Sequence, residues 1–377
     1  MRKLLILALA LSMVISLSSC GDGGGTGSGD GDSAGDASAP DIKAELSVGF
    51  IFLDSATDNG FTQAHDNGRL ALQDYFGGSV ATMAAENVDE NDNEAVRGAA
   101  VRMIEGGCKV IIGCSFGYMA VLQELAAEHD DVTFLHFSGF MMSDNMDYYF
   151  GAMEEPRYLS GMVAGMMTRS NRIGYVAAYP YSEVLVGINA FALGAQSVNP
   201  AAEVEVAYID SWYDPEREKS AAESLIGRGC DVIGQHTNTA EPIRAAEENG
   251  VFAIGYNLDN SEAAPNAYLT APVWDHGSYY IRVIERILDG EFTPEGFYGR
   301  MRDGYVDLAP LTYLVPDDVA ARVNEARDMI MTGELAPFSG EILDANGRTL
   351  CAAGQSLSKD EIWEISEVVR GVRVPEI

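Results

Sequence analysis

The chain has 377 residues, with 24 Lys and Arg against 57 Asp and Glu and a formal net charge of −33 at pH 7. So acidic a surface excludes nucleic-acid binding of the phosphate-neutralising kind and a polybasic attachment to anionic lipid. Apolar residues make up 47% of the sequence, which is enough for a large core, and the length exceeds what one core normally serves. We therefore expect two folded lobes and no nucleic-acid partner.

The first nineteen residues predict a secretory signal. Arg2 and Lys3 form a short positive region, residues 4–17 form an apolar run, and Leu17-Ser-Ser-Cys20 closes it. The run is too short for a membrane-spanning helix. Leu-Ser-Ser-Cys resembles a bacterial lipobox, which predicts cleavage after residue 19 and a lipid on Cys20. An ordinary cleaved signal with an incidental cysteine is the alternative.

A Gly, Ser and Asp-rich tether follows at residues 20–40, so the folded body begins near residue 41. This arrangement predicts a protein held by lipid at the extracytoplasmic face of the cell membrane. The other cysteines form no Cys-x-x-Cys pair and have no histidine at metal spacing, so they are interpreted as small buried hydrophobic residues. No metal or cofactor is expected. These cysteines are Cys108, Cys114, Cys230 and Cys351.

The body alternates short β-branched runs with amphipathic segments of helical length, a pattern that predicts an α/β fold with parallel sheets. Strands are expected at residues 46–53, 80–84, 110–114, 132–137, 173–179, 204–209, 232–236, 252–256, 268–273 and 305–311. Helices are expected at residues 93–105, 118–128, 217–227, 243–249 and 277–288, with a final helical stretch after the last strand.

Residues 104–115 and 226–237 align without gaps, as Ile-Glu-Gly-Gly-Cys-Lys-Val-Ile-Ile-Gly-Cys-Ser and Ile-Gly-Arg-Gly-Cys-Asp-Val-Ile-Gly-Gln-His-Thr. Both read as a helix end, a glycine cap and a buried strand. The match suggests two lobes of one plan. Ligands bind beyond the carboxyl ends of strands in open α/β sheets, so two such lobes would form one cleft.

Gly113-Cys-Ser115-Phe-Gly117 fits the nucleophile-elbow pattern of serine hydrolases. That alternative would use Ser115 as nucleophile and His236 or His276 as base, after an acid such as Asp210. A pattern with three fixed positions arises easily in a chain with 40 glycines, so a non-catalytic ligand contact is favoured.

Candidate ligand contacts follow several of the predicted strands. The loop at residues 54–61 offers carboxylates and one aromatic face, and aromatic rings at later strand ends suit a flat ring, whose faces stack while its edges are read by polar groups. The aromatic candidates are Phe61, Phe116, Tyr179, Trp212 and Trp274, with Tyr118, Tyr181, Tyr213 and Tyr256 nearby. The polar candidates are Asp58, Ser115, Gln235, His236, Thr237, Asn257, Asp259 and Asp275.

Several segments together resemble the basic membrane protein family of substrate-binding lipoproteins for ABC importers, which includes purine nucleoside receptors. The resemblance covers nearly all of residues 45–377 and is closest to the branch associated with free purine bases such as adenine. The segments are Val48-Gly-Phe-Ile, Asp58-Asn-Gly-Phe61-Thr-Gln-Ala-His65-Asp-Asn-Gly-Arg69, Ser115-Phe-Gly-Tyr-Met, Gly187-Ile-Asn-Ala-Phe-Ala-Leu-Gly194, Ser211-Trp-Tyr-Asp-Pro215 and Gln235-His-Thr.

The resemblance implies a type I periplasmic-binding-protein fold, in which three crossovers join two Rossmann-like lobes that close on a ligand. Crossovers are expected near Phe150, Val273 and Leu311. They would give a first lobe of residues 41–150 with about 274–311, and a second of 151–273 with about 312–377.

The resemblance also implies roles for single residues. Phe61 would stack on a purine, facing Trp212 or Tyr179, and Asn257-Leu-Asp259 would hold its polar edge. Gln235, Thr237 and Ser115 would read the same edge. The family's nucleoside receptors have a ribose-binding lysine where this chain has Trp274-Asp275, which favours a smaller, adenine-like ligand.

The implied activity is binding and delivery to an ABC permease powered by a separate ATPase, without covalent chemistry. A sensory lipoprotein of the same fold is the other possibility. The acidic surface should repel anionic solutes, which favours a neutral ligand over a nucleotide.

Overall fold

The computed structural model describes residues 44–375, which lie within one compact unit, Ile42–Ile377. The predicted signal peptide, the lipid site at Cys20 and the tether fall outside the described residues. Anchoring by lipid therefore stays a prediction.

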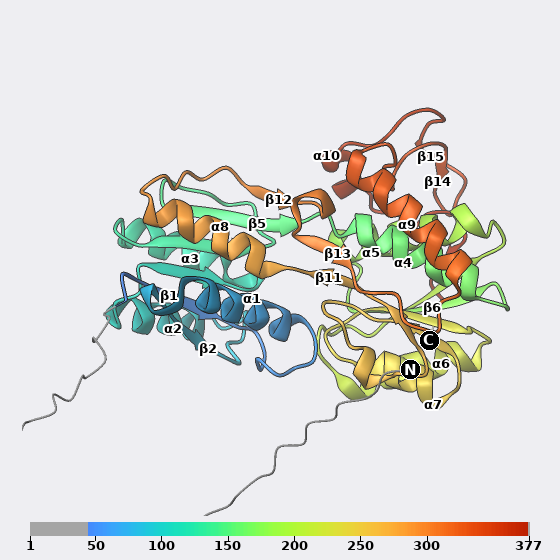
Figure 1. Ribbon diagram of the computed structural model, residues 1–377, viewed down its shortest axis with the longest axis horizontal. Coiled ribbons are helices and arrows are strands. Elements are labelled where there is room, and N and C mark those ends of the chain that lie inside the picture. Colours follow the sequence, from blue (N-terminus) through green and yellow to red (C-terminus); the bar gives the residue numbers. More distant parts are fainter. Residues whose placement is uncertain (1–43, 376–377) are drawn as a thin grey trace, which may run out of the picture. The chain divides into compact units, whose positions relative to one another are not determined.

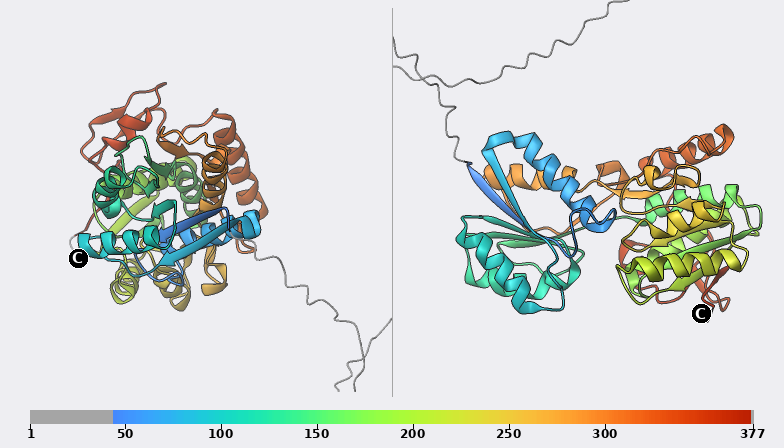
Figure 2. Two further views of the ribbon diagram at one scale, coloured as in Figure 1. Left: turned by 90° about the vertical axis from the view of Figure 1, so that its left-hand side faces the viewer. Right: turned by 90° about the horizontal axis from the view of Figure 1, so that it is seen from below.

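Two six-stranded parallel sheets organise the described residues (Figure 1). The first has the strand order β12-β5-β4-β3-β1-β2. Its helices form pairs, with α1 packed on α8 and α2 on α3, and Figure 2 shows α1 and the teal helices on opposite sides of the strands. The elements are β1 (Leu46–Ile51), α1 (Phe61–Phe76), β2 (Val80–Ala85), α2 (Asn93–Glu105), β3 (Val110–Gly113), α3 (Met119–Glu128), β4 (Thr133–Phe137), β5 (Met146–Gly151), α8 (His276–Leu288) and β12 (Phe297–Gly299).

The second sheet has the order β10-β9-β8-β6-β7-β16. Here α4 packs closely on α5, and a Cβ at Gly161 of α4 would lie only 2.0 Å from the carbonyl oxygen of Phe191 in α5. The elements are α4 (Glu154–Met167), β6 (Arg172–Ala177), α5 (Ser182–Val198), β7 (Glu203–Tyr208), α6 (Pro215–Gly227), β8 (Val232–His236), α7 (Glu241–Glu248), β9 (Phe252–Ile254), β10 (Tyr268–Thr270), α9 (Asp317–Thr332) and β16 (Val372–Arg373).

The remaining elements are short. Strands β11 (Pro272–Trp274) and β13 (Val306–Leu308) pair antiparallel, as do β14 (Ile342–Leu343) and β15 (Thr349–Cys351). Helix α10 (Lys359–Trp363) follows, and 3₁₀ turns occupy Gly77–Ser79, Phe116–Tyr118, Ser261–Ala263 and Met301–Asp303.

The predicted α/β class with two parallel sheets is confirmed. Strands β3 and β8 are buried at every residue and lie in the interior of their sheets. Cys108 and Cys230 lie before these two strands, after Gly107 at φ +97° and Gly229 at φ +95°. The internal similarity therefore corresponds to the same helix–turn–strand unit at the same place in each sheet.

The chain crosses between the sheets at three places, as expected. The first lies between β5 and α4, and the others run through β11 and β13. All three places lie close to the expected positions near Phe150, Val273 and Leu311. The exact lobe boundaries stay a prediction.

The prediction for the four body cysteines is confirmed, since all are buried and unpaired in the described chain. Among residues 44–375, no helix is long and apolar enough to span a membrane.

Candidate functional site

A cavity of about 950 Å³ is lined by residues of both lobes. Aromatic side chains dominate its walls. Phe61, Phe137, Phe150 and Trp274 line it from the first lobe and the β11 crossover, and Tyr181, Trp212 and Tyr256 line it from the second lobe. Such a wall suits a flat ligand that presents two faces for stacking.

Phe61 begins α1 and is held by the loop before it. The Asp58 carboxylate accepts hydrogen bonds from the backbone N–H groups of Gly60, Thr62 and Gln63 at 2.8, 2.8 and 3.0 Å. Asp58 therefore caps α1 and fixes the place of Phe61, and it does not line the cavity. The Phe61 ring meets Phe137 edge-on at 5.5 Å between centroids.

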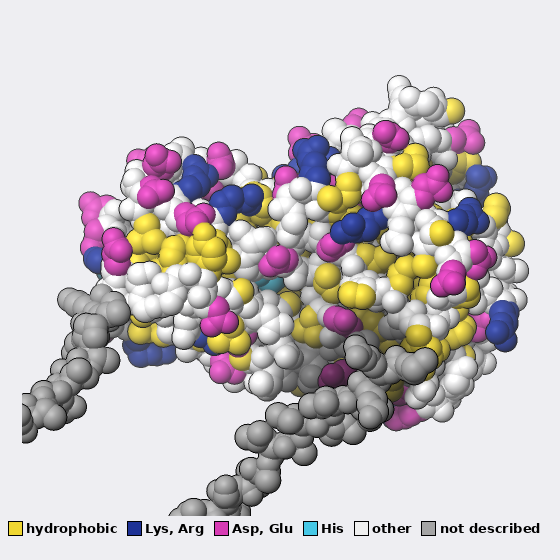
Figure 3. Space-filling view, viewed as in Figure 1, with side chains coloured by type: hydrophobic (Ala, Val, Ile, Leu, Met, Phe, Trp, Pro, Cys, Tyr) yellow, Lys and Arg dark blue, Asp and Glu magenta, His cyan; other side chains and the backbone are white. Residues whose placement is uncertain are grey.

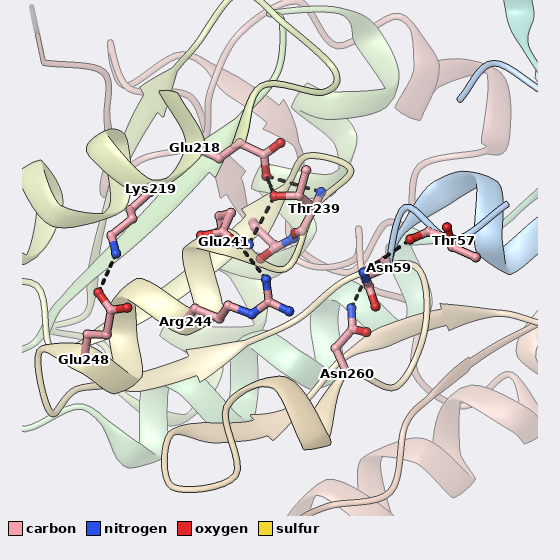
Figure 4. A network of polar contacts seen from close by, with 10 residues as sticks. Thr57, Asn59, Glu218, Lys219, Thr239, Glu241, Arg244, Glu248 and Asn260 are labelled. Carbon is pink, nitrogen blue, oxygen red and sulfur yellow. Dashed lines mark hydrogen bonds and ion pairs between the residues drawn. The ribbon is translucent and has the colours of Figure 1, made fainter. Parts of the chain in front are cut away.

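The loop also touches the second lobe. The Asn260 side chain donates to the carbonyl oxygen of Asn59 at 2.9 Å, a contact visible in Figure 4. A Cβ on Gly60 would lie 1.7 Å from the carbonyl oxygen of Asn238, so only glycine fits there. Asn238 itself lines the cavity.

Trp274 packs against a stack of two histidine rings. Its ring stacks on His276, with centroids 5.4 Å apart and planes 11° apart, and His276 stacks on His65 at 3.7 Å. Burial lowers the pKa of His65 to about 3 and that of His276 well below its usual value, so both imidazoles are neutral near pH 7. The rings form an uncharged stack behind the cavity wall.

On the second lobe, Trp212 and Tyr181 line the cavity and Tyr179 stacks behind Tyr181 at 5.0 Å. His236 also lines the cavity, and its pKa is well below the usual value because of burial and the nearby Arg157. Arg157 is fully buried, with its guanidinium 3.8 Å from the centroid of the Tyr256 ring. The wall behind His236 and Tyr256 therefore carries a cation.

The structure contradicts the serine-hydrolase alternative. The Ser115 hydroxyl donates to the Glu90 carboxylate, which also accepts from the backbone N–H of Gly117 at 3.2 Å. Within residues 44–375, no hydrogen bond joins Ser115 to His236 or His276, and His276 pairs instead with the Tyr305 hydroxyl at 2.9 Å. The elbow motif thus lacks its base, and Ser115 and Phe116 simply line the cavity.

Carboxylic acids are the main charged groups of the cavity. Glu90, Glu154, Glu183 and Asp360 line it, whereas Lys359 is the one Lys or Arg among its described lining residues. Burial raises the pKa of both Glu154 and Glu183 to about 7. The cavity therefore disfavours anionic ligands and offers strong hydrogen-bond acceptors.

The structure brings Phe61, Ser115, Phe116, Trp212, His236 and Trp274 together on the cavity wall. The other predicted residues do not line it and have partners within the protein. Asp275 caps α8 through the Ser278 N–H, Asp259 accepts from the Ser261 N–H, and Thr237 donates to Glu218 at 2.7 Å. The Gln235 side chain donates to the Thr239 carbonyl at 2.7 Å, and Asn257 accepts from Trp274.

Sequence reasoning missed part of the wall. Tyr148 and Phe150 lie on β5, and Tyr298 lies on β12, two strands that were not predicted. The run Met146-Asp-Tyr-Tyr-Phe-Gly151 carried an aromatic signal that could have identified β5. Lys359, Asp360 and Trp363 gave no such signal, because only the tertiary fold brings α10 to the cavity.

Comparisons with known proteins agree with this architecture. Residues 45–334 match the family model described as ABC transporter substrate-binding protein PnrA-like, the Bmp family. The chain belongs to this family. It is therefore a substrate-binding protein and not an enzyme, as the resemblance implied.

Two curated relatives carry ligand names. A purine-binding protein of Brucella abortus is 37% identical over 334 residues, which cover 89% of this chain and 95% of that protein. A putative ABC transporter glucose-binding protein of Haloferax volcanii is 34% identical, over 82% of this chain and 78% of that protein.

Solved structures show the same fold. An ABC transporter solute-binding protein from Conexibacter woesei matches with a TM-score of 0.65 at 22% identity, over 77% of this chain and 98% of that one. A solute-binding protein from Aeropyrum pernix gives 0.68 at 18% identity, over 77% and 92%. This family member thus has the predicted type I periplasmic-binding-protein fold.

Proposed function

We propose that this Bmp-family protein is an extracytoplasmic lipoprotein that captures a purine base or nucleoside in its cavity and delivers it to an ABC permease. The observation that carries the proposal is the aromatic cavity, with Phe61 and Trp274 on one side and Trp212 on the other. The 37% identity to a purine-binding protein supports the same ligand class.

Two features narrow the class of ligand that we propose. Trp274 and Asp275 stand where the resemblance places a ribose-binding lysine, which favours a compact, adenine-like ligand. The cavity carboxyls and the acidic surface disfavour nucleotides. On the face shown in Figure 3, acidic side chains are spread over the surface among Lys and Arg, so repulsion of anions would come from the whole surface.

Thermal unfolding of the purified protein with separate ligands tests the proposal. A ligand that binds only the folded state stabilises it by about 2.7 kcal/mol at one hundred times its Kd. We expect adenine to raise the Tm by several degrees and adenosine monophosphate to leave it unchanged. A rise with glucose and with no purine would contradict the proposal and favour the ligand named for the Haloferax relative.

The membrane part of the proposal rests on Cys20 and has its own test. Cys20 is expected to incorporate labelled palmitate in cells, and Cys20→Ala should release the protein from the membrane fraction. A soluble wild-type protein would contradict lipid anchoring.

A further inference from the structure

One wall of the cavity comes from a part of the chain that the family model does not match. The match ends at residue 334, yet Lys359, Asp360 and Trp363 of α10 line the cavity. The segment is fixed to the second lobe, because the Asn189 side chain of α5 bonds to the backbone of Glu367 and Val369. Strand β16 then joins the second sheet beside β7. The segment is therefore an integral wall of the site.

Helix α10 also reaches the edge of the first sheet, where β5 and β12 pair (Figure 1). The Trp363 ring lies 5.4 Å from the Phe150 ring, and its Nε1–H donates to the Tyr298 hydroxyl at 3.3 Å. The Lys359 ammonium lies 4.5 Å from the centroid of the Tyr298 ring. Lys359 therefore contacts the face of the Tyr298 ring, and Trp363 donates a hydrogen bond to the Tyr298 oxygen.

The hydroxyl of Tyr298 continues the chain of hydrogen bonds. It donates to Oε2 of Glu154 at 3.0 Å, and Glu154 is 5% exposed at the start of α4. A phenol has one proton to donate. Because Trp363 occupies the oxygen as a donor, the proton of Tyr298 is directed to Glu154. All three side chains line the cavity.

We propose that Trp363 is a positioning residue, which through Tyr298 fixes the Glu154 carboxylate as an acceptor for an N–H or O–H group of the ligand. The nature of that ligand rests on the proposed function, whereas the positioning of Glu154 does not. The segment after residue 334 would then set specificity at this end of the cavity.

Charges around Glu154 give the proposal a pH signature. Burial and the neighbouring Glu155 raise the pKa of Glu154. A hydrogen bond from its own backbone N–H, the Tyr298 hydrogen bond and Arg300 lower it, and the resulting pKa is about 7. Lys359 is the cation on the α10 side. Loss of the Tyr298 hydrogen bond removes a contact that favours the carboxylate, so the pKa of Glu154 should rise. Near pH 7 a larger fraction of the Glu154 side chains would then be protonated, and a protonated carboxyl is a poorer acceptor for a hydrogen bond from the ligand.

The first experiment measures purine affinity between pH 6 and 9 in wild type and in Trp363→Phe, which keeps a ring and removes the N–H. We expect 3- to 10-fold weaker binding at pH 7, recovery by pH 9, and an alkaline shift of the affinity midpoint by half a pH unit or more. Trp212→Phe is the matched control, since it changes a cavity ring outside this chain of hydrogen bonds. It should alter affinity equally at every pH.

The second experiment needs no ligand. Carbon-13 NMR of the Glu154 carboxyl in the unliganded protein should show a higher pKa in Trp363→Phe and in Tyr298→Phe than in wild type. Tyr298→Phe also serves if Trp363→Phe does not fold. An unmoved Glu154 pKa in either folded variant would overturn the proposal. A wild type that binds no purine, with a shifted Glu154 pKa in the variants, would overturn the purine assignment alone.

Discussion

The indole N–H of Trp274 donates to the side-chain oxygen of Asn257 at 3.1 Å, which ties the β11 crossover to the end of the second sheet. Asn257 has φ +71°, a left-handed conformation that asparagine tolerates better than most residues, and it is fully buried. Both residues were predicted to contact ligand. In the structure Trp274 lines the cavity, whereas Asn257 does not line it and holds the Trp274 indole in place through this hydrogen bond.

Asn257→Gly should weaken purine binding several-fold, because it leaves the buried indole N–H without its acceptor while keeping the left-handed backbone. We expect a loss of about 1–3 kcal/mol in the free energy of unfolding, measured with urea. Asn257→Ala adds backbone strain and should lose about 1 kcal/mol more. Unchanged affinity in a folded Asn257→Gly protein would show that Trp274 needs no such support.

Gly60→Ala should disturb the contact between the lobes, since its Cβ would lie 1.7 Å from the Asn238 carbonyl oxygen. We expect weaker ligand binding and a changed radius of gyration by small-angle X-ray scattering. Gly227→Ala, where a Cβ meets nothing within 4 Å, is the control and should change neither quantity. Equal affinity and equal radius of gyration in the two variants would contradict a close contact between Gly60 and Asn238.

Thr237→Val should lower stability more than affinity. The Thr237 hydroxyl donates to Glu218 at 2.7 Å, and the Thr239 hydroxyl donates to the same carboxylate at 2.7 Å (Figure 4). None of these three residues lines the cavity. Loss of one such hydrogen bond costs about 1–3 kcal/mol. Purine affinity should stay within two-fold. A ten-fold loss of affinity with unchanged stability would contradict this structural role and indicate that Thr237 contacts the ligand directly.

Stability without ligand should be greatest in mildly acidic solution. The pKa of buried His65 is about 3 in the folded protein, so stability falls as pH drops below 6.5, where the unfolded imidazole gains a proton. The pKa values of Glu154 and Glu183 are raised to about 7, so their contribution is lost as pH rises from about 4.5 through 7.

Urea unfolding from pH 4 to 8.5 measures this pH dependence, and Glu183→Gln is expected to flatten the decline on the alkaline side. Stability that climbs steadily to pH 8 would contradict the raised pKa values of Glu154 and Glu183, and stability that does not fall between pH 6.5 and 4 would contradict the lowered pKa of His65.

Much of the fold was readable from the sequence because buried parallel strands are continuous apolar runs, as at Val110–Gly113. The site was only partly readable. Asp58 and Asp275 look like ligand carboxylates after strands, but both cap helices, and sequence alone does not separate the two uses. Trp363 enters the cavity through contacts between distant parts of the chain, which no local pattern encodes.

Calorimetric titration of the purified protein with adenine tests the central claim most directly, with Phe61→Ala beside it. A stacked base contributes about 1–3 kcal/mol, so we predict one-site binding by wild type and affinity weakened roughly 5- to 150-fold in the variant. No heat of binding with adenine, hypoxanthine or adenosine, or equal affinity in Phe61→Ala, would contradict the account.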